Sequence, residues 1–597
     1  MQPIDWLIMI FYLILTLIPG AYVSRRVLNQ ERIDFFAARR SLSWWLSGTS
    51  MAATTFSADT PLYIAGIVAN GGIAGNWEWW CFGFAHVLMI YLFARLWRRS
   101  EIVTDAELTE LRYGGKTAAV LRGVKAFLFA VPLNCLGIGY AMLAMMKLMA
   151  VLQVRSAPDT PDTLVGGPKL WIAIALTVVV ILYAAFSSLW PVVATDFFQF
   201  YIALFGSLIV AAVSVNAVGG MRPLVEQLSA TNPEMLNFVP LRFDQGIEWS
   251  GLVAIPSSTF LAYGFLQWWS FRRSDGGGEF VQRLAASKTT VDAEKAAWLF
   301  SVLHYVVRTW PWIISALAAV VLYPDLIDKE LGYPLLLVDY LPPVILGVVA
   351  TSLMAAFLGT VSTLINWGAS YLTTDGYVRF LSPTATASEQ WLVGRAASIL
   401  VAVLGGTVAF VSNDIATIFR LAIAVGTGPG LVLILRWFWW RINAAAELAA
   451  VVVGFVAGLV TSAGPSWLSI EAFGLRLWVI TAVTTLVWVV TMWVTPAESD
   501  QVLDRFFAQI RPGGPGWEKQ RRRTGLKPLQ NLALDGQKAL AALLVLFGSM
   551  FSVGGFLLLR SPTGWLSLIV AVSGGLWLRR LTKRPAFSTP RPGIEDG

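Results

Sequence analysis

The sequence repeats apolar runs of about 20 residues, the length that an α-helix needs to cross the hydrocarbon core of a membrane. Scanning the 597 residues for this pattern gives about fifteen runs. Their approximate centres are residues 14, 57, 87, 138, 178, 204, 260, 312, 354, 400, 426, 456, 484, 549 and 570. Charged residues make up only 13% of the chain, about half the share of a soluble domain. The sequence therefore predicts an all-α, multi-pass integral membrane protein of about fifteen transmembrane helices.

The distribution of Lys and Arg predicts how these helices are oriented. The first run has neither a basic segment before it nor a small-residue cleavage site, so we expect an uncleaved helix that starts outside. With that start, the outer connections contain only Arg155, Lys169, Arg222, Arg242, Lys329 and Arg560. All the richly basic loops then fall on the other side. The positive-inside rule thus predicts an outer N-terminus and an inner C-terminus.

Cysteine and histidine are too scarce for several classes of function. Cys81 and Cys135 lie in apolar runs, which excludes a disulfide scaffold or a cysteine-rich metal site. His86 and His304 are too few for a haem pair, a di-iron cluster or a histidine-based zinc site. The net charge of +8 lies in short clusters between apolar runs, a topology signal rather than a nucleic-acid surface. With no HExxH motif either, a membrane enzyme is not predicted.

Several charged residues fall inside predicted spans, where a charge is costly and usually functional. Those in mid-span are Asp59, Glu78, Asp196, Arg308 and Arg420. Opposite charges spread over five helices suggest a shared polar interior, and the alternative is buried ion pairs that only hold helices together. Lys147 and Arg476 lie near predicted outer ends, where a long side chain reaches water, so we interpret both as structural.

Two spans are unusually rich in small and hydroxyl residues. The run 48–61 places Gly, Ser and Thr in mid-span and ends at Pro61, a composition that favours an interrupted helix. In lipid, an interruption survives only where it lines a cavity, and its free carbonyls suit a small hard cation. The second span, 355–366, pairs Thr360 with Thr363 on one face. Alone, this second pattern is also typical of ordinary helix packing.

At this point the sequence resembles a known family, the sodium:solute symporters, over about residues 5 to 495. The resemblance rests on ordered motifs: Ser41–Trp45 with Gly48–Ser50 and Phe56–Ala58, Trp77–Trp79, Thr104–Glu107 with Leu111–Gly114, Ser187–Trp190 through Thr195–Gln199, Val281–Lys288, 355–377, and Arg436–Asn443. It implies a LeuT-like core of two inverted five-helix repeats, each with an interrupted first helix, here the spans near 57 and 260.

The resemblance also implies a division of the chain. Residues 1–40 would be an extra N-terminal helix and inner loop, and 41–440 the transporter core, with repeats at about 42–216 and 249–438. Two peripheral helices would follow at 441–495, then a basic cytoplasmic linker at 496–537, and two further helices with a cytoplasmic tail at 538–597.

The family's main sodium site, carried over by position, implies four ligands in this chain. They are the carbonyls of Ala53, Phe56 and Ala356 and the hydroxyl of Thr360. The family usually has a second hydroxyl just before Thr360, where this chain has Gly359. The site therefore lacks one oxygen, and weaker sodium affinity or a different ion preference would follow unless water or a neighbour supplies it.

A second sodium site, found in some members, resembles Asp196 facing Ser362 and Thr363. A carboxylate with two hydroxyls suits a hard monovalent ion. The same Asp196 also fits a proton carrier or a structural partner of a hydroxyl network.

The resemblance further implies a substrate site. Glu78 matches the glutamate of an aromatic-Glu-Trp motif in the sugar-transporting branch, and Arg308 replaces a lysine of that branch. Two glutamines of the branch appear here as Thr60 and Phe419, which argues against a simple glucose transporter. The remaining predicted substrate residues are Arg420, Trp268 and Trp269. Arginines suit carboxylates, so an acidic substrate is compatible.

The segment 272–279 departs from the family pattern. Its glycine triplet is followed by no Lys-Ser/Thr pair and preceded by no strand, so a P-loop is not predicted. We expect a flexible cytoplasmic hairpin instead.

Together these features predict sodium-coupled symport of a small polar solute, a sugar, sugar acid or other organic acid, by alternating access. Na+ would be the co-transported ion, and the bacterial inner membrane the location. The partners would be a small-molecule solute and the lipid bilayer but no nucleic acid, and the sequence leaves the oligomeric state open. The alternatives are a proton-coupled symporter of the same fold and a transporter-like membrane sensor. The sequence names neither the solute nor the number of sodium ions.

Overall fold

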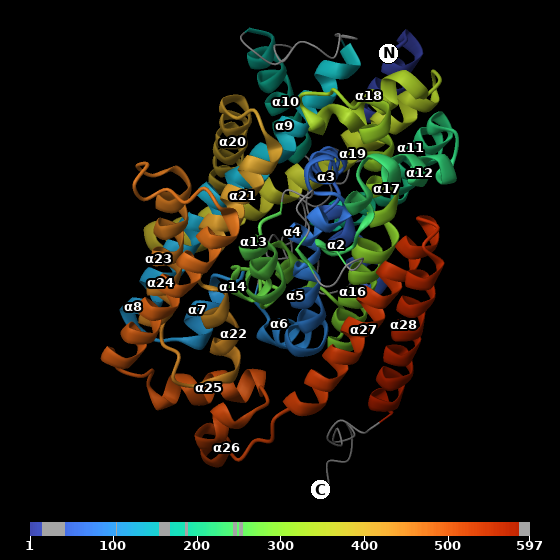
Figure 1. Cartoon of the computed structure of the whole chain (residues 1–597). Helices are drawn as coiled ribbons and strands as arrows, with labels where there is room; N and C mark the ends of the chain where they lie inside the picture. Colours follow the sequence, from blue (N-terminus) through green and yellow to red (C-terminus); the bar gives the residue numbers. More distant parts are fainter. Residues whose placement is uncertain are drawn as a thin grey trace, which may run out of the picture.

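The computed structural model describes residues 1–14, 42–102, 104–153, 167–185, 189–242, 248–249 and 255–583. Within these residues the protein is a bundle of helices with one small antiparallel sheet, β1 (Leu241–Arg242) against β2 (Glu248–Trp249) (Figure 1). The inner loop predicted within residues 1–40 and the end of the predicted tail, residues 584–597, lie outside the described residues.

The helices follow one another along the chain in three groups. The first is α2 (Trp44–Thr54), α3 (Asp59–Gly71), α4 (Trp77–Trp80), α5 (Phe82–Leu88), α6 (Ala94–Ser100), α7 (Glu107–Arg112), α8 (Gly115–Leu128), α9 (Asn134–Gln153), α10 (Gly167–Ala185), α11 (Leu189–Val218) and α12 (Met221–Thr231). The second is α13 (Ser257–Ala262), α14 (Trp268–Ser270), α15 (Glu279–Ala285), α16 (Thr290–Ser301), α17 (Thr309–Leu322), α18 (Gly332–Tyr340), α19 (Ile345–Ser370), α20 (Ala387–Val411), α21 (Ile415–Gly426) and α22 (Gly430–Phe438). The third is α23 (Ala444–Ala463), α24 (Phe473–Val494), α25 (Asp500–Ile510), α26 (Glu518–Thr524), α27 (Leu532–Leu557) and α28 (Ser561–Thr582).

Short 3-10 and π segments join several of these helices. The 3-10 segments are Ile73–Asn76 (η3), Pro233–Leu236 (η7), Lys329–Leu331 (η10) and Pro515–Trp517 (η12). The π segments are Met89–Phe93 (η4), Phe129–Leu133 (η5), Tyr263–Gln267 (η8), Val302–Val307 (η9) and Tyr371–Leu381 (η11).

The apolar helices agree with the predicted multi-pass membrane fold, whereas the predicted number of about fifteen membrane-crossing helices stays a prediction. Ten helices in the described part of the chain are long and apolar enough to span a membrane, with three shorter apolar helices at Pro3–Ile14, Lys169–Ala184 and Ile415–Gly426. These helices cover every predicted centre except those near 57 and 260. The two exceptions are built from shorter pieces.

The first of these spans is interrupted between Thr54, the last residue of α2, and Asp59, the first of α3. Its small residues allow close packing, because a Cβ at Gly48 would lie 2.6 Å from the Ala296 carbonyl oxygen of α16. The hydroxyl of Thr54 donates back to the Ser50 carbonyl at 2.8 Å, the local bonding by which Thr can bend a helix. The predicted interruption near residue 55 is therefore present.

The second span runs without a break through α13, η8 and α14, and then leaves helical geometry at Phe271. The non-helical stretch continues to Gly278, whose φ of 81° is left-handed, and α15 follows. Ser274 and Asp275 within this stretch are buried. The expectation of a flexible hairpin on the cytoplasmic side at 272–279 was wrong as to flexibility, because Ser274 and Asp275 are enclosed by other parts of the protein.

The segment 496–537, predicted as a linker, also folds. Helix α25 has a hydrophobic face of Leu503, Phe506, Phe507 and Ile510, all buried, and Trp517 stacks on Phe506 with 5.4 Å between ring centroids. In Figure 1 α25 and α26 cap the lower end of the bundle, and α27 and α28 form a hairpin along one side (red).

Candidate functional site

The interruption after α2 faces α19 across a small void of about 10 Å³. The void is lined by Ala53, Phe56, Asp196, Gln199, Phe200, Ala356 and Gly359. The Thr360 hydroxyl donates to the carbonyls of Thr54, at 3.2 Å, and Phe56, at 3.1 Å, beside the same interruption. Thus three of the four residues predicted to bind sodium line one void. The fourth, Thr360, donates a hydrogen bond to Phe56, which is one of those three. A void of this size accommodates about one water-sized particle.

Asp196, Ser362 and Thr363 lie beside this void, together with an arginine that sequence reasoning missed. Asp196 Oδ2 accepts from the Ser50 hydroxyl at 2.6 Å and lies 3.7 Å from Arg283 Nη2. The same nitrogen donates to Thr363 at 3.2 Å, whereas Ser362 donates to the Gly359 carbonyl within its own helix at 3.1 Å. Arg283, fully buried, thus provides a fixed cation between Asp196 and Thr363.

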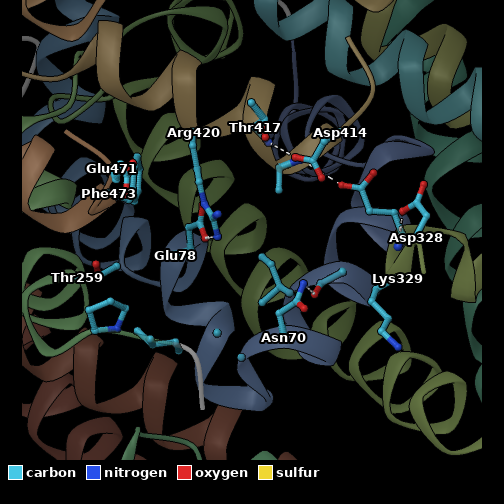
Figure 2. A pocket seen from close by; sticks show the side chains of 18 of the residues that line it. Asn70, Glu78, Thr259, Asp328, Lys329, Asp414, Thr417, Arg420, Glu471 and Phe473 are labelled. Carbon is cyan, nitrogen blue, oxygen red and sulfur yellow. Dashed lines mark hydrogen bonds and ion pairs between the residues drawn. The ribbon is translucent and has the colours of Figure 1, made fainter. Parts of the chain in front are cut away.

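A larger cavity of about 760 Å³, which we call the vestibule, lies at the predicted outer end of the bundle (Figure 2). Its polar lining includes Asn70, Glu78, Lys147, Thr259, Tyr263, Asp328, Lys329, Glu330, Asp414, Thr417, Arg420 and Glu471. The volume falls in the range of small-molecule sites.

Glu78 and Arg420 meet within the vestibule, and Figure 2 shows Arg420 reaching from α21 to the carboxylate. Arg420 Nε donates to Oε1 at 2.8 Å and Nη2 to Oε2 at 2.9 Å, a bidentate pair. The Glu78 side chain is only 2% exposed, but the Arg420 side chain is 44% exposed. The predicted substrate residue Phe419 is not among the residues that line the vestibule, and its ring packs on Tyr63 with 4.7 Å between ring centroids.

The other predicted substrate residues lie elsewhere. Arg308 Nη1 donates to the Ala52 carbonyl at 2.8 Å and Nη2 to the Thr55 hydroxyl at 3.0 Å, so Arg308 binds the C-terminal end of α2. The indoles of Trp268 and Trp269 donate to carbonyls one turn earlier in their own helix. Thr60 lies in the first turn of α3. None of these four residues is among those that line the vestibule.

Residues 35–454 match the model of the Sodium:solute symporter family. The chain belongs to this family. The sodium/glucose cotransporter of Vibrio parahaemolyticus is 24% identical over 481 residues, 75% of this chain and 83% of that one. The sodium/myo-inositol cotransporter 2 of Rattus norvegicus is 24% identical over 77% of this chain and 70% of its own.

The fold resembles that of a solved structure, a substrate-bound outward-open Na+-coupled sialic acid symporter. The TM-score is 0.63 at 17% identity, covering 83% of this chain and 99% of that one. These findings confirm the predicted family and a multi-pass membrane transporter rather than an enzyme, with sodium as the coupling ion.

The rim of the symporter's vestibule carries a second charge cluster. Lys147 donates to Asp328 at 2.7 Å and to Glu330 at 2.6 Å, so this lysine is paired with carboxylates instead of reaching freely into water. Glu330 also accepts from the backbone N–H groups of Ile415, at 3.0 Å, and Ala416, at 3.1 Å. Glu330 therefore binds the first turn of α21, the helix that presents Arg420.

This cluster predicts a pH dependence of solute affinity. Burial raises the pKa of Glu330 to about 7, although Lys147 opposes the shift and the carboxylates of Asp414 and Asp328 add to it. The charged form, which binds Lys147 and α21, is thus lost as the outer pH falls through about 7. We expect the half-saturating solute concentration in vesicle uptake to rise over that range, and Glu330→Gln to flatten the profile. An unchanged profile in Glu330→Gln would contradict this role.

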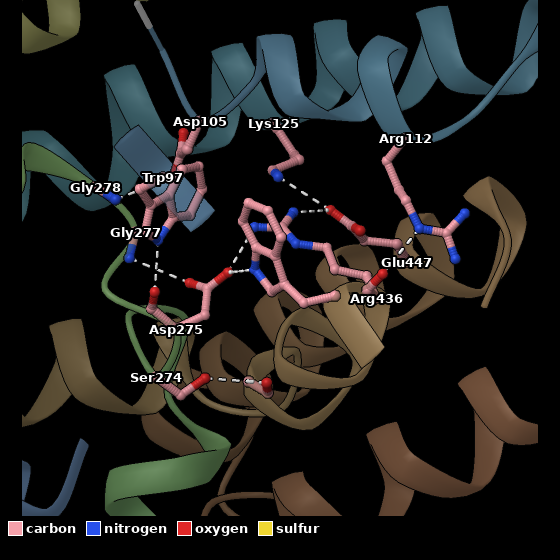
Figure 3. A network of polar contacts seen from close by, with 12 residues as sticks. Trp97, Asp105, Arg112, Lys125, Ser274, Asp275, Gly277, Gly278, Arg436 and Glu447 are labelled. Atoms are coloured by element: carbon pink, nitrogen blue, oxygen red, sulfur yellow. Dashed lines mark hydrogen bonds and ion pairs between the residues drawn. The ribbon is translucent and has the colours of Figure 1, made fainter. Parts of the chain in front are cut away.

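Farther from the vestibule lies a buried set of charges that we call the arginine network: Arg112, Lys125, Asp275, Arg436 and Glu447 (Figure 3). Arg436 donates to Asp275 at 2.8 Å and to Glu447 at 2.9 Å, and Glu447 also accepts from Lys125 at 3.0 Å. Arg112 donates to the Arg436 carbonyl at 2.8 Å. The network ties the non-helical stretch before α15 to α7, α8, α22 and α23.

Proposed function

We propose that this symporter couples inward sodium movement to the uptake of a small hydroxylated organic acid, such as a sugar acid. The observation that carries the substrate class is the bidentate Glu78–Arg420 pair in the vestibule. The Arg420 side chain is 44% exposed, so its N–H groups that do not bind Glu78 can bind a solute carboxylate, and Glu78 can accept hydrogen bonds from hydroxyl groups of the solute.

The charges around the vestibule support this arrangement. Lys147 pairs with both Asp328 and Glu330, and Asp414 accepts from the backbone N–H of Thr417 at the start of α21. Arg420 is therefore the cation that we expect to bind the carboxylate of an anionic solute in the vestibule. The ring of Tyr263, which lines the vestibule, supplies an apolar surface for a sugar ring.

We propose the void at Ala53, Phe56, Ala356 and Thr360 as the site of the coupling sodium ion. Backbone carbonyls beside an interrupted helix are suitable ligands, and sodium bound there would fix α2 against α19. Coupling requires only that sodium favour the arrangement in which the vestibule accepts solute.

The membrane arrangement belongs to the same proposal. The vestibule opens outward, the arginine network closes the inner side, and two inverted repeats at about 42–216 and 249–438 form the core within residues 41–440. The N-terminus lies outside and the C-terminus inside a bacterial inner membrane, as the loop charges favour and as a bacterial relative supports. Because Arg283 already neutralises Asp196, we propose one sodium ion per cycle.

Removing the Thr360 hydroxyl tests the ion site. Thr360→Ala loses a ligand and both hydrogen bonds to the interruption, so we expect the half-saturating sodium concentration for uptake to rise about tenfold. Thr351→Ala, which removes a hydroxyl bonded only within α19, is the matched control. Uptake whose sodium dependence is the same in both variants would place the ion elsewhere.

The substrate class is tested by uptake into proteoliposomes with and without a sodium gradient. The panel contains sugars, sugar acids, amino acids and monocarboxylates. We expect sodium-dependent uptake of a sugar acid, with the neutral sugar of the same skeleton transported poorly. Preferential uptake of neutral glucose or myo-inositol, the solutes named for the relatives, would refute the acidic class but retain sodium symport.

A further inference from the structure

We propose that the side-chain amide oxygen of Gln199 is a sodium ligand that replaces the hydroxyl missing at Gly359. The inference rests on the proposed function, because it adds one atom to the ion site of the same transport cycle. It concerns a residue of α11 that the motif-based assignment did not include.

The geometry at Gly359 carries the inference. A Cβ placed on Gly359 would lie 2.8 Å from Gln199 Oε1 and 3.4 Å from Asp196 Oδ1. The amide oxygen therefore occupies the space in which a side chain at position 359 would begin. Gln199 and Gly359 line the same void as Ala53, Phe56 and Ala356.

The other end of the amide is held away from the void. Gln199 Nε2 donates to the hydroxyl of Tyr12 at 2.9 Å and to that of Tyr183 at 3.4 Å. These two bonds fix which way the amide faces, so its oxygen is directed toward Gly359. Tyr12 belongs to the short N-terminal helix, Pro3–Ile14, which thereby contributes to the ion site without touching the ion.

The chemistry of the ligand fits the ion. An amide oxygen is a hard, neutral ligand of the same kind as a backbone carbonyl. With it, the site has five oxygens: the carbonyls of Ala53, Phe56 and Ala356, the hydroxyl of Thr360, and Gln199 Oε1. The nearby Asp196 is not counted as a ligand, because its Oδ2 accepts from Ser50 and pairs with Arg283.

The test uses the fact that the Gln199 amide oxygen and a side chain at position 359 would compete for the same space. Sodium binding is measured on the purified full-length protein in detergent, from the rise in unfolding temperature with sodium, with choline keeping the ionic strength constant. Gln199→Ala removes one ligand, and we expect the half-saturating sodium concentration to rise about tenfold. In Gly359→Ser the new hydroxyl takes over, so adding Gln199→Ala to it should change that concentration less than about twofold.

Two further variants keep the test decisive if Gln199→Ala does not fold. Gly359→Ala pushes the amide aside without providing an oxygen, so we expect weaker sodium binding than in Gly359→Ser. Tyr12→Phe keeps Gln199 but releases its amide, and we expect a loss of about threefold.

The possible results separate the two proposals. If Gln199→Ala has no effect, or the same effect with and without Gly359→Ser, Gln199 is not the replacement ligand. If Thr360→Ala still weakens sodium binding in that case, the ion site stands and only this inference falls. If neither Thr360→Ala nor Gln199→Ala changes sodium binding, the proposed ion site itself is wrong.

Discussion

Arg436→Ala is expected to lower the free energy of unfolding by about 3 to 5 kcal/mol, because it leaves charged groups buried without their partner. Arg436 is shared between Asp275 and Glu447, and all three side chains are at most 2% exposed. Chemical or thermal unfolding of the purified protein in detergent measures the change. The variant should also take up solute poorly if, as proposed, the arginine network closes the inner side during transport.

Lys519→Ala is the matched control for this prediction. Lys519 also pairs with a carboxylate, Asp500, but at 3.5 Å and with a side chain that is 59% exposed, so its loss should cost about 0 to 1 kcal/mol. Equal destabilisation by the two substitutions would mean that the arginine network contributes no more than an ordinary surface pair.

Arg420→Ala is expected to raise the half-saturating concentration of an acidic solute by on the order of 100-fold, equivalent to about 3 kcal/mol. The substitution removes the guanidinium and leaves the buried Glu78 carboxylate without its bidentate partner. Arg420→Lys keeps a charge but not the fork, so we expect an intermediate loss. Initial rates of sodium-driven uptake over a range of solute concentrations measure both.

Lys329→Ala separates this specific role from a general effect of positive charge. Lys329 also lines the vestibule, but it donates to the Pro324 carbonyl and not to Glu78. Its removal should leave the half-saturating concentration nearly unchanged. A loss as large as that of Arg420→Ala would indicate long-range attraction of the anion rather than direct binding.

The all-helical, multi-pass character of the fold was predictable from the sequence, because every helix that crosses a membrane has to satisfy the same requirement of length and apolarity. The interruption after Thr54 was also predictable, since hydroxyl residues and Pro61 act locally on the backbone. The carbonyls predicted to bind sodium and Glu78 came from positional resemblance. In the structure Ala53, Phe56 and Ala356 line one void and Glu78 lines the vestibule, and their binding roles stay predictions.

The partners of buried charges were not predictable, because they come from distant helices. Arg283 is 87 residues from Asp196 in the sequence, 283 − 196, yet the two share an ion pair. Asp275 lies in a glycine-rich stretch that is typical of a surface loop, and only tertiary packing encloses it. Similarly, the indoles of Trp268 and Trp269 donate hydrogen bonds within their own helical segment. These bonds depend on the side-chain rotamers, which the sequence motif does not specify.

The hairpin of α27 and α28 has a practical consequence. The Trp310 indole of α17 donates to the Met550 carbonyl of α27 at 2.9 Å, and a Cβ at Gly554 would overlap the same indole. Helices α27 and α17 are therefore closely packed, and we expect them to move together. Helix α28 presents exposed residues such as Ile569 and Leu576 on its far side. A fluorescent label attached at Ile569 or Leu576 would report movement of α17 during transport through its contact with α27, without a label in the vestibule.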